Sequence, residues 1–111
     1  MVIAKTDLFE EELQKRANLF KTLAHPARLQ ILQYLAQTRT CLSGDISDMF
    51  PISRTTVNQH MCELKHAGLI EGHEKEGKIV YCLDPSKMDE MNNILNAFLE
   101  EVQLPQDFCC H

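Results

Sequence analysis

The sequence predicts a mainly α-helical domain that carries one β-hairpin, in the order α-α-α-α-β-β-α. Apolar residues recur at helical spacing in five stretches, at residues 7–23, 26–37, 42–50, 54–67 and 86–102. The pattern becomes alternating in two others, at residues 69–74 and 78–83. A chain of 111 residues is long enough for one modest core and too short for two. We therefore expect a single domain.

The first two helices are separated by His25-Pro26. Proline cannot continue a helix but suits the first turn of the next one. The apolar stripe of the first helix is wider than one small core needs, and includes Leu8, Leu13, Ala17 and Phe20. The last helix has a similarly wide stripe, which includes Met91, Leu95, Phe98 and Val102. We expect these two helices to pair across a two-fold axis in a homodimer.

The stretch from Asp45 to Leu69 predicts a helix, a tight turn and a second helix. Pro51 closes the first helix of this pair, and Ser53 can cap the second by accepting a hydrogen bond from a free backbone amide. Gly68 can adopt the left-handed conformation that ends a helix in a Schellman motif. The second helix is thus fixed at both ends.

The second helix of the pair has two different faces. Val57, Met61 and Leu64 form a narrow apolar stripe at helical spacing. Hydroxyl, amide and guanidinium groups lie away from this stripe, on Arg54, Thr55, Asn58 and Gln59. These groups offer the short, directional donors and acceptors that read base edges in a major groove. An ordinary solvated surface helix is the alternative interpretation.

A hairpin that follows a helix-turn-helix is a wing, and Gly77 lies in its turn. Lys75 and Lys78 at the tip could contact phosphates. Ser86 with Asp89 three residues later resembles a capping box, which predicts that the last helix opens at Ser86. The fold class is therefore a winged helix-turn-helix.

Charge and composition restrict the function further. The formal net charge of −5 argues against a general polyanion binder. Between Phe20 and Gly68, however, five basic residues stand against three acidic ones, so this middle segment is +2. The sequence contains no 18-residue apolar run and no export signal, which favours a cytoplasmic protein without a membrane partner. No catalytic triad, carboxylate pair or phosphate loop is present, so we do not expect an enzyme.

Three blocks of sequence resemble the ArsR/SmtB family of winged-helix metalloregulatory repressors. They are LAHPARLQIL from Leu23, ISRTTVNQHMCELKHAGLI from Ile52 and GKIVYCLD from Gly77. The resemblance implies a homodimer that represses an operon by binding double-stranded operator DNA and that dissociates when an inducer binds. By position, the operator-contacting residues would be Arg54, Thr55, Asn58, Gln59 and His60. Together with the order of the helices, the resemblance covers nearly the whole chain. We therefore expect one winged helix-turn-helix domain over residues 1–111, with dimerisation helices at about 7–23 and 86–102.

Five cysteines in a reducing compartment are more typical of ligands or redox sensors than of disulfides. The resemblance implies an inducer site at the start of the helix-turn-helix, where this sequence has Cys41, with Ser43 at the second thiol position. The family's other site, on the last helix, is missing because this helix has no histidine. The flexible tail, residues 106–111, contains Cys109 and Cys110, which could supply the missing thiol ligands.

Cys41, Cys109 and Cys110 together would offer three thiolates, a set suited to As(III) or Sb(III). His111 as a fourth ligand would make a Cys3His set suited to Zn(II) or Cd(II). The alternative without a ligand is that Cys41 is a small buried residue and that Cys109-Cys110 is a disordered end. Two further interpretations stay open. One is the same repressor sensing oxidation or persulfide through its cysteines. The other is a thiol protein that handles metalloid without binding DNA.

Overall fold

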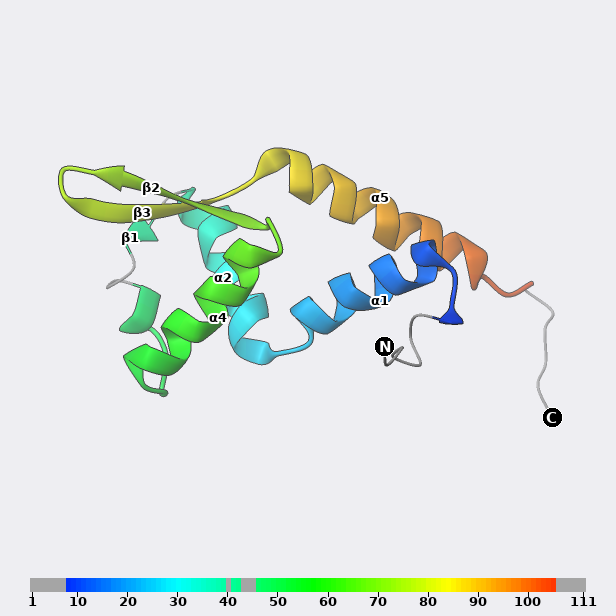
Figure 1. Cartoon of the computed structure of the whole chain (residues 1–111), viewed down its shortest axis with the longest axis horizontal. Coiled ribbons are helices and arrows are strands. Elements are labelled where there is room, and N and C mark those ends of the chain that lie inside the picture. The colour runs from blue at the N-terminus through cyan, green and yellow to red at the C-terminus, as the bar shows by residue number, and fades with distance from the viewer. Residues whose placement is uncertain (1–7, 40, 43–45, 106–111) are drawn as a thin grey trace.

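The computed structural model describes residues 8–39, 41–42 and 46–105. Figure 1 shows its helices and strands in order. They are α1 (Glu11–Leu23), α2 (Pro26–Thr38), β1 (Cys41–Leu42), α4 (Arg54–His66), β2 (Ile70–Lys75), β3 (Lys78–Leu83) and α5 (Pro85–Glu101). Ile46 and Ser47 are also helical. The predicted winged helix-turn-helix is confirmed, with an additional strand, β1.

Strand β1 corrects the prediction that a helix begins at Leu42. Cys41 pairs with Tyr81 and Leu42 with Val80, so β1 lies antiparallel to β3 and the sheet has the order β1-β3-β2. Pairing with β1 satisfies backbone groups on the edge of β3 that would otherwise be unpaired. Among the described residues of this segment, helical geometry begins at Ile46.

The core lies between α2, α4 and the base of the wing. Its fully buried side chains are Ile31, Leu35, Ile46, Val57, Leu64 and Ile70. Met61 and Leu69 complete the cluster. The predicted stripe of α4 is confirmed, because Val57, Met61 and Leu64 are all buried. This packing fixes which face of α4 points outward.

Both predicted ends of α4 are confirmed. The Ser53 hydroxyl oxygen accepts from the backbone N–H of Thr56 at 3.2 Å. Gly68 has a φ of +82°, and the N–H of Leu69 donates to the carbonyl of Leu64 at 3.0 Å. These are the elements of a Schellman motif. Helix α4 therefore has a defined start and stop.

The wing is a tight hairpin followed directly by α5. Glu76 and Gly77 both have positive φ, as a two-residue type I′ turn requires. The capping box predicted at Ser86 is wrong. Asp84 caps α5 instead, because its Oδ1 accepts from the N–H groups of Ser86 and Lys87 at 2.9 and 3.2 Å. Pro85, which has no N–H and a suitable φ, takes the first helical position.

Helices α1 and α5 lie side by side and extend away from the wing (Figure 1). The rings of Phe20 and Phe98 meet edge to face with centroids 5.4 Å apart. Arg16 forms an ion pair with Glu101 near the end of α5. The pair of terminal helices thus forms one end of the molecule, and the wing tip with the start of α4 forms the other.

Candidate DNA-binding surface

The outward face of α4 carries the polar side chains that the sequence predicted for it. Arg54, Thr55, Asn58 and Gln59 are all exposed. Arg54 approaches the Asp48 carboxylate at 3.9 Å, and both side chains lie in solvent. Because such exposed pairs are weak, Arg54 stays available to a stronger anion. This face can offer guanidinium, hydroxyl and amide groups to a partner at once.

His60 is placed differently from these four residues. Only 9% of it is exposed, and its Nδ1 accepts a hydrogen bond from Nε of Arg28 at 3.1 Å. Its ring lies against that of His25, with centroids 4.1 Å apart. Burial, the His25 ring and the Arg28 guanidinium lower the pKa of His60. The prediction that His60 contacts an operator does not fit this buried position.

Arg28 is a positioning residue that the sequence patterns did not single out. It donates from Nε to His60 on α4 and from a terminal nitrogen to the carbonyl of Thr22 at 3.0 Å. One side chain of α2 thereby joins the last turn of α1 to α4. In the sequence, Arg28 stands out only because it lies shortly after His25-Pro26. That position does not reveal its contact with His60, 32 residues later.

The wing tip presents two cations. Lys75 and Lys78 are directly opposite each other in the hairpin register, and both are exposed. Glu74 and Glu76 lie beside them and reduce the local positive charge. In Figure 1 this tip and the start of α4 lie at the same end of the long axis. We call the outward face of α4 and the wing tip together the polar edge.

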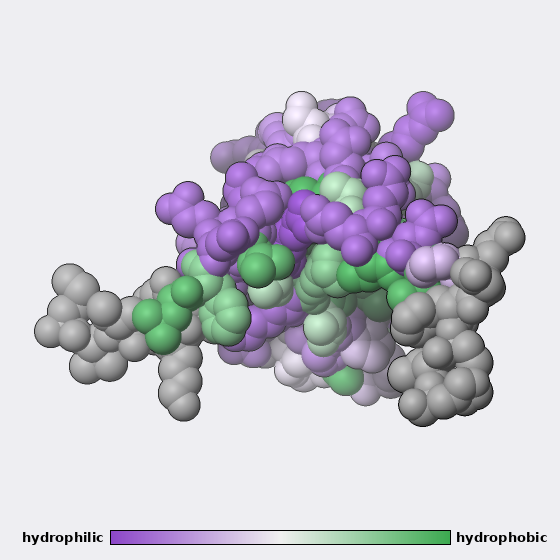
Figure 2. Space-filling model, turned by 90° about the vertical axis from the view of Figure 1, so that its right-hand side faces the viewer, coloured by the Kyte–Doolittle hydropathy of each residue, from purple (hydrophilic) through white to green (hydrophobic). Residues whose placement is uncertain are grey.

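An apolar surface occupies the opposite end of the molecule. Phe9, Leu13, Ala17, Phe20 and Phe98 line a groove between α1 and α5 together with Gln14 and Arg16. Figure 2 views this end and shows hydrophobic residues in a band across its middle. Five apolar side chains on or just beyond the two helices are more than half exposed: Leu8, Phe9, Leu99, Val102 and Leu104. We call this region the terminal-helix surface.

The terminal helices bury little within one chain. Helix α5 has no buried residue, and α1 buries only Arg16. An exposed apolar surface of this kind is typical of a protein interface.

The predicted thiol site falls mostly beyond the described part of the chain. Cys109, Cys110 and His111 lie outside the described residues, and only the backbone of Cys41 is described, as part of β1. Cys62 is exposed on α4, and Cys82 is half-buried on β3. Whether the predicted ligands come together thus stays a prediction.

Known proteins resemble this chain in both sequence and structure. A model of a helix-turn-helix domain matches residues 23–73. The transcriptional repressor SdpR of Bacillus subtilis is 35% identical over 80 residues, which cover 71% of this chain and 88% of SdpR. This chain belongs to the ArsR family of winged helix-turn-helix regulators.

Two solved structures support the membership of the ArsR family. One, described as a possible transcriptional regulator for arsenical resistance, is 25% identical, has a TM-score of 0.65, and covers 71% of this chain and 81% of its own. The other is Rv0081 of Mycobacterium tuberculosis, which is 27% identical, has a TM-score of 0.66, and covers 85% of this chain and 94% of its own.

ArsR-family proteins are DNA-binding transcriptional regulators and not enzymes, as the sequence predicted. The alternative of a thiol protein that does not bind DNA is not supported by this membership. In the described part of this ArsR-family chain, no helix is both long and apolar enough to cross a membrane.

Proposed function

We propose that this chain is a homodimeric repressor that binds a palindromic operator and is released by a thiol-binding inducer, As(III) or Sb(III). The observation that carries the proposal is the separation of two surfaces. The polar edge of α4 and the wing lies at one end of the molecule, and the apolar terminal-helix surface lies at the other. A dimer formed through the apolar end leaves both polar edges free for DNA.

The polar edge suits the major groove and the adjacent phosphates. Asn58 and Gln59 can pair with an adenine edge, and Arg54 with guanine or phosphate. Lys75 and Lys78 at the wing tip would contact backbone phosphates. Two copies in a dimer would bring their recognition helices about one DNA turn apart, roughly 34 Å. Because the net charge is −5, directed contacts rather than bulk attraction would provide the affinity.

Operator recognition is tested by replacing one side-chain amide on α4 and, as a control, one on another helix. Asn58→Ala is expected to weaken binding to the chain's own promoter fragment by about 1–3 kcal/mol, because it removes a base contact. Gln33→Ala, an exposed change on α2, is the matched control and is expected to leave binding unchanged. Equal effects of the two changes in an electrophoretic mobility assay would contradict the assignment of α4 as the reading element.

The inducer part of the proposal rests on residue chemistry and on the place of Cys41. Three thiolates from Cys41, Cys109 and Cys110 match the preference of a soft trivalent ion. Cys41 belongs to β1, which pairs with the wing strand β3. A shift of the β1 backbone caused by a bond at Cys41 would therefore act directly on strand β3 of the wing. A coupling of about 3 kcal/mol would lower operator affinity roughly 150-fold. Zn(II) or Cd(II), with His111 as a fourth ligand, is the alternative occupant.

Release is tested with Cys41→Ser. This variant is expected to bind operator DNA as the unchanged protein does, and to stay bound when arsenite is added. Cys62→Ser, which replaces the exposed thiol of α4, is the matched control and should still be released. Separate titrations with arsenite, Zn(II) and an oxidant identify the signal. Dissociation by oxidant alone would show that the cysteines sense oxidation or persulfide instead.

A further inference from the structure

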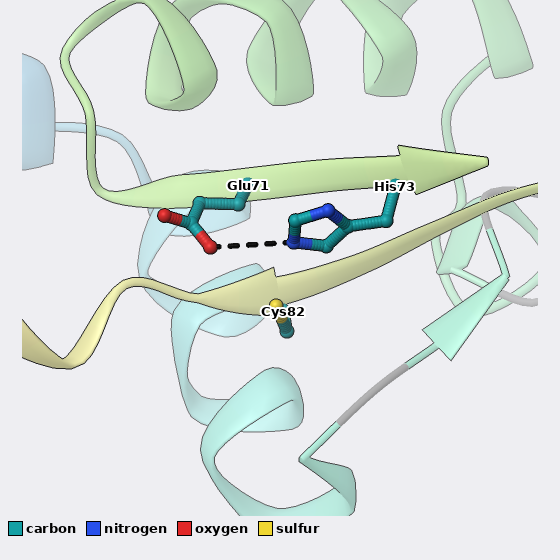
Figure 3. Close-up of side chains that lie close together, drawn as sticks. All are labelled: Glu71, His73 and Cys82. Carbon is teal, nitrogen blue, oxygen red and sulfur yellow. Dashed lines mark hydrogen bonds and ion pairs between the residues drawn. The ribbon is translucent and has the colours of Figure 1, made fainter.

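The wing carries three metal-ligating side chains on one face of its sheet. Glu71 and His73 are two residues apart on β2, so both point to the same side. Cys82 on β3 is the register partner of Glu71. Their ligand atoms all lie within 4.8 Å of one another. Figure 3 shows the carboxylate and the imidazole facing each other along β2, with the Cys82 sulfur beside them.

The spacing of these atoms is close to that of a zinc site. Nε2 of His73 lies 3.3 Å from Oε2 of Glu71. A nitrogen and an oxygen bound to one tetrahedral zinc ion are about 3.4 Å apart, given bond lengths of about 2.0–2.2 Å. The corresponding nitrogen-to-sulfur separation is about 3.6 Å with a zinc-to-sulfur bond of about 2.3 Å. The Cys82 sulfur lies within 4.8 Å of the other two ligand atoms, so it needs to approach by at most about 1.2 Å, which side-chain rotation can supply.

The backbone beneath the three side chains is held in place. The register from Ile70 to Lys75 is continuous, so the separation of the two strands is fixed. On the opposite face, a Cβ atom at Gly72 would lie only 3.1 Å from Cε1 of Tyr81, which means that the ring packs closely against the strand. The side chains of His73 and Glu71 are 64% and 45% exposed, so solvent can reach them. A fourth ligand can therefore be water.

We propose that Glu71, His73 and Cys82 form a site for a divalent cation of the zinc type, with water as the fourth ligand. A set of one thiolate, one imidazole and one carboxylate suits zinc and not magnesium or calcium. On binding, the thiol of Cys82 loses its proton to solvent and its sulfur bonds to the ion. The hydrogen bond between His73 and Glu71 is replaced by two bonds to the metal. The ion would cross-link β2 to β3.

This wing site is separate from the thiol site proposed for the inducer. It uses neither Cys41 nor the tail, and its occupancy can be measured without DNA. Failure of the wing site would therefore leave the repressor proposal intact, and the reverse also holds. To isolate it, Cys41, Cys109 and Cys110 are all changed to serine in the full-length chain. Cys62 and Cys82 are then the remaining thiols.

Cobalt(II) is the probe, because a thiolate bound to cobalt gives a charge-transfer absorbance in the near ultraviolet. The triple-serine protein is expected to show this band at one cobalt ion per chain. Adding Cys82→Ser should remove the band, and adding Cys62→Ser should leave it unchanged. Absence of the band in the triple-serine protein, or its persistence after Cys82→Ser, would overturn the proposal.

His73→Gln provides an independent test at an exposed position that should not disturb folding. Loss of a direct ligand is expected to weaken zinc binding in the triple-serine protein by more than about 100-fold, since even outer-shell partners contribute about 10- to 100-fold. His66→Gln, another exposed histidine, is the control and should not change the affinity. Equal zinc affinity in the His73→Gln and unchanged proteins would overturn the assignment of His73. Circular dichroism confirms that each variant is folded.

Discussion

His60 joins α4 to α2 through one imidazole ring. Its Nδ1 accepts from Arg28 on α2, and its ring lies against His25, the residue that caps α2. Accepting this hydrogen bond requires a neutral ring with a free lone pair on Nδ1. A proton on that nitrogen would remove the bond and place a positive charge beside the Arg28 guanidinium. Packing of the recognition helix against α2 is therefore coupled to the protonation of one residue.

The lowered pKa of His60 makes stability depend on pH in a definite direction. In the unfolded chain the imidazole takes up its proton near the ordinary value of 6.5, whereas in the folded protein it does so only at lower pH. The stabilisation is thus fully present above pH 6.5 and is lost as the pH falls below it. We expect the urea midpoint to drop between about pH 7.5 and about pH 5.5.

His60→Gln tests this coupling, because glutamine cannot titrate. The drop in the urea midpoint over this range should be smaller in His60→Gln than in the unchanged protein. His73→Gln, at an exposed wing position, is the control and should retain the full drop. Parallel curves for the unchanged and His60→Gln proteins would mean that His60 does not carry the effect.

Helix α4 illustrates what a single sequence can predict at the scale of an element. The cap at Ser53, the stop at Gly68 and the stripe of Val57, Met61 and Leu64 are encoded locally, within one or two helical turns. All were predicted and are present. The outward positions of Asn58 and Gln59 followed from the same periodicity.

Features that depend on distant residues were missed or misplaced. Strand β1 exists because β3, some 40 residues later, offers it a partner edge. The burial of His60 depends on Arg28 and His25, which come from another helix. Glu71, His73 and Cys82 meet only because the hairpin register aligns them. Neither the β1 pairing nor the contacts of His60 leave a periodic signal in the sequence. The two-residue spacing of Glu71 and His73 places them on one face, but it does not show that Cys82 joins them.

Gly68 is the position where the end of α4 is most sensitive to substitution. Its φ of +82° is unfavourable for residues with a Cβ atom, so Gly68→Ala should lower the free energy of unfolding by about 1–2 kcal/mol. The added methyl would also lie 3.1 Å from Cε of Lys87, a flexible side-chain atom that can move. The cost is therefore mainly in the backbone. Gly68→Asn, which tolerates this conformation better, should cost less in the same urea titration.

At the scale of the whole molecule, the terminal helices contact each other, and no other element of the described residues covers their apolar surface. Arg16, only 9% exposed, donates to the carboxylate of Glu101 from both terminal nitrogens and lowers the pKa of that carboxyl. Phe20 and Phe98 add an aromatic contact nearby. These contacts fix the angle between α1 and α5 within one chain. Among the described residues, apolar side chains of the terminal-helix surface still face solvent, so this part of the chain presents a preformed apolar surface.

Leu99→Asp tests whether a second copy covers the terminal-helix surface. Leu99 is 61% exposed in one chain, so the change should barely affect the fold of that chain. In a dimer it would bury an unpaired charge, which costs about 3–5 kcal/mol and weakens association by more than about 100-fold. Analytical ultracentrifugation should then find single copies, and operator affinity should fall because two linked recognition helices are lost. Ile79→Asp, at an exposed apolar position of the wing, is the control and should remain dimeric. A Leu99→Asp protein that sediments as a dimer would show that the copies associate elsewhere.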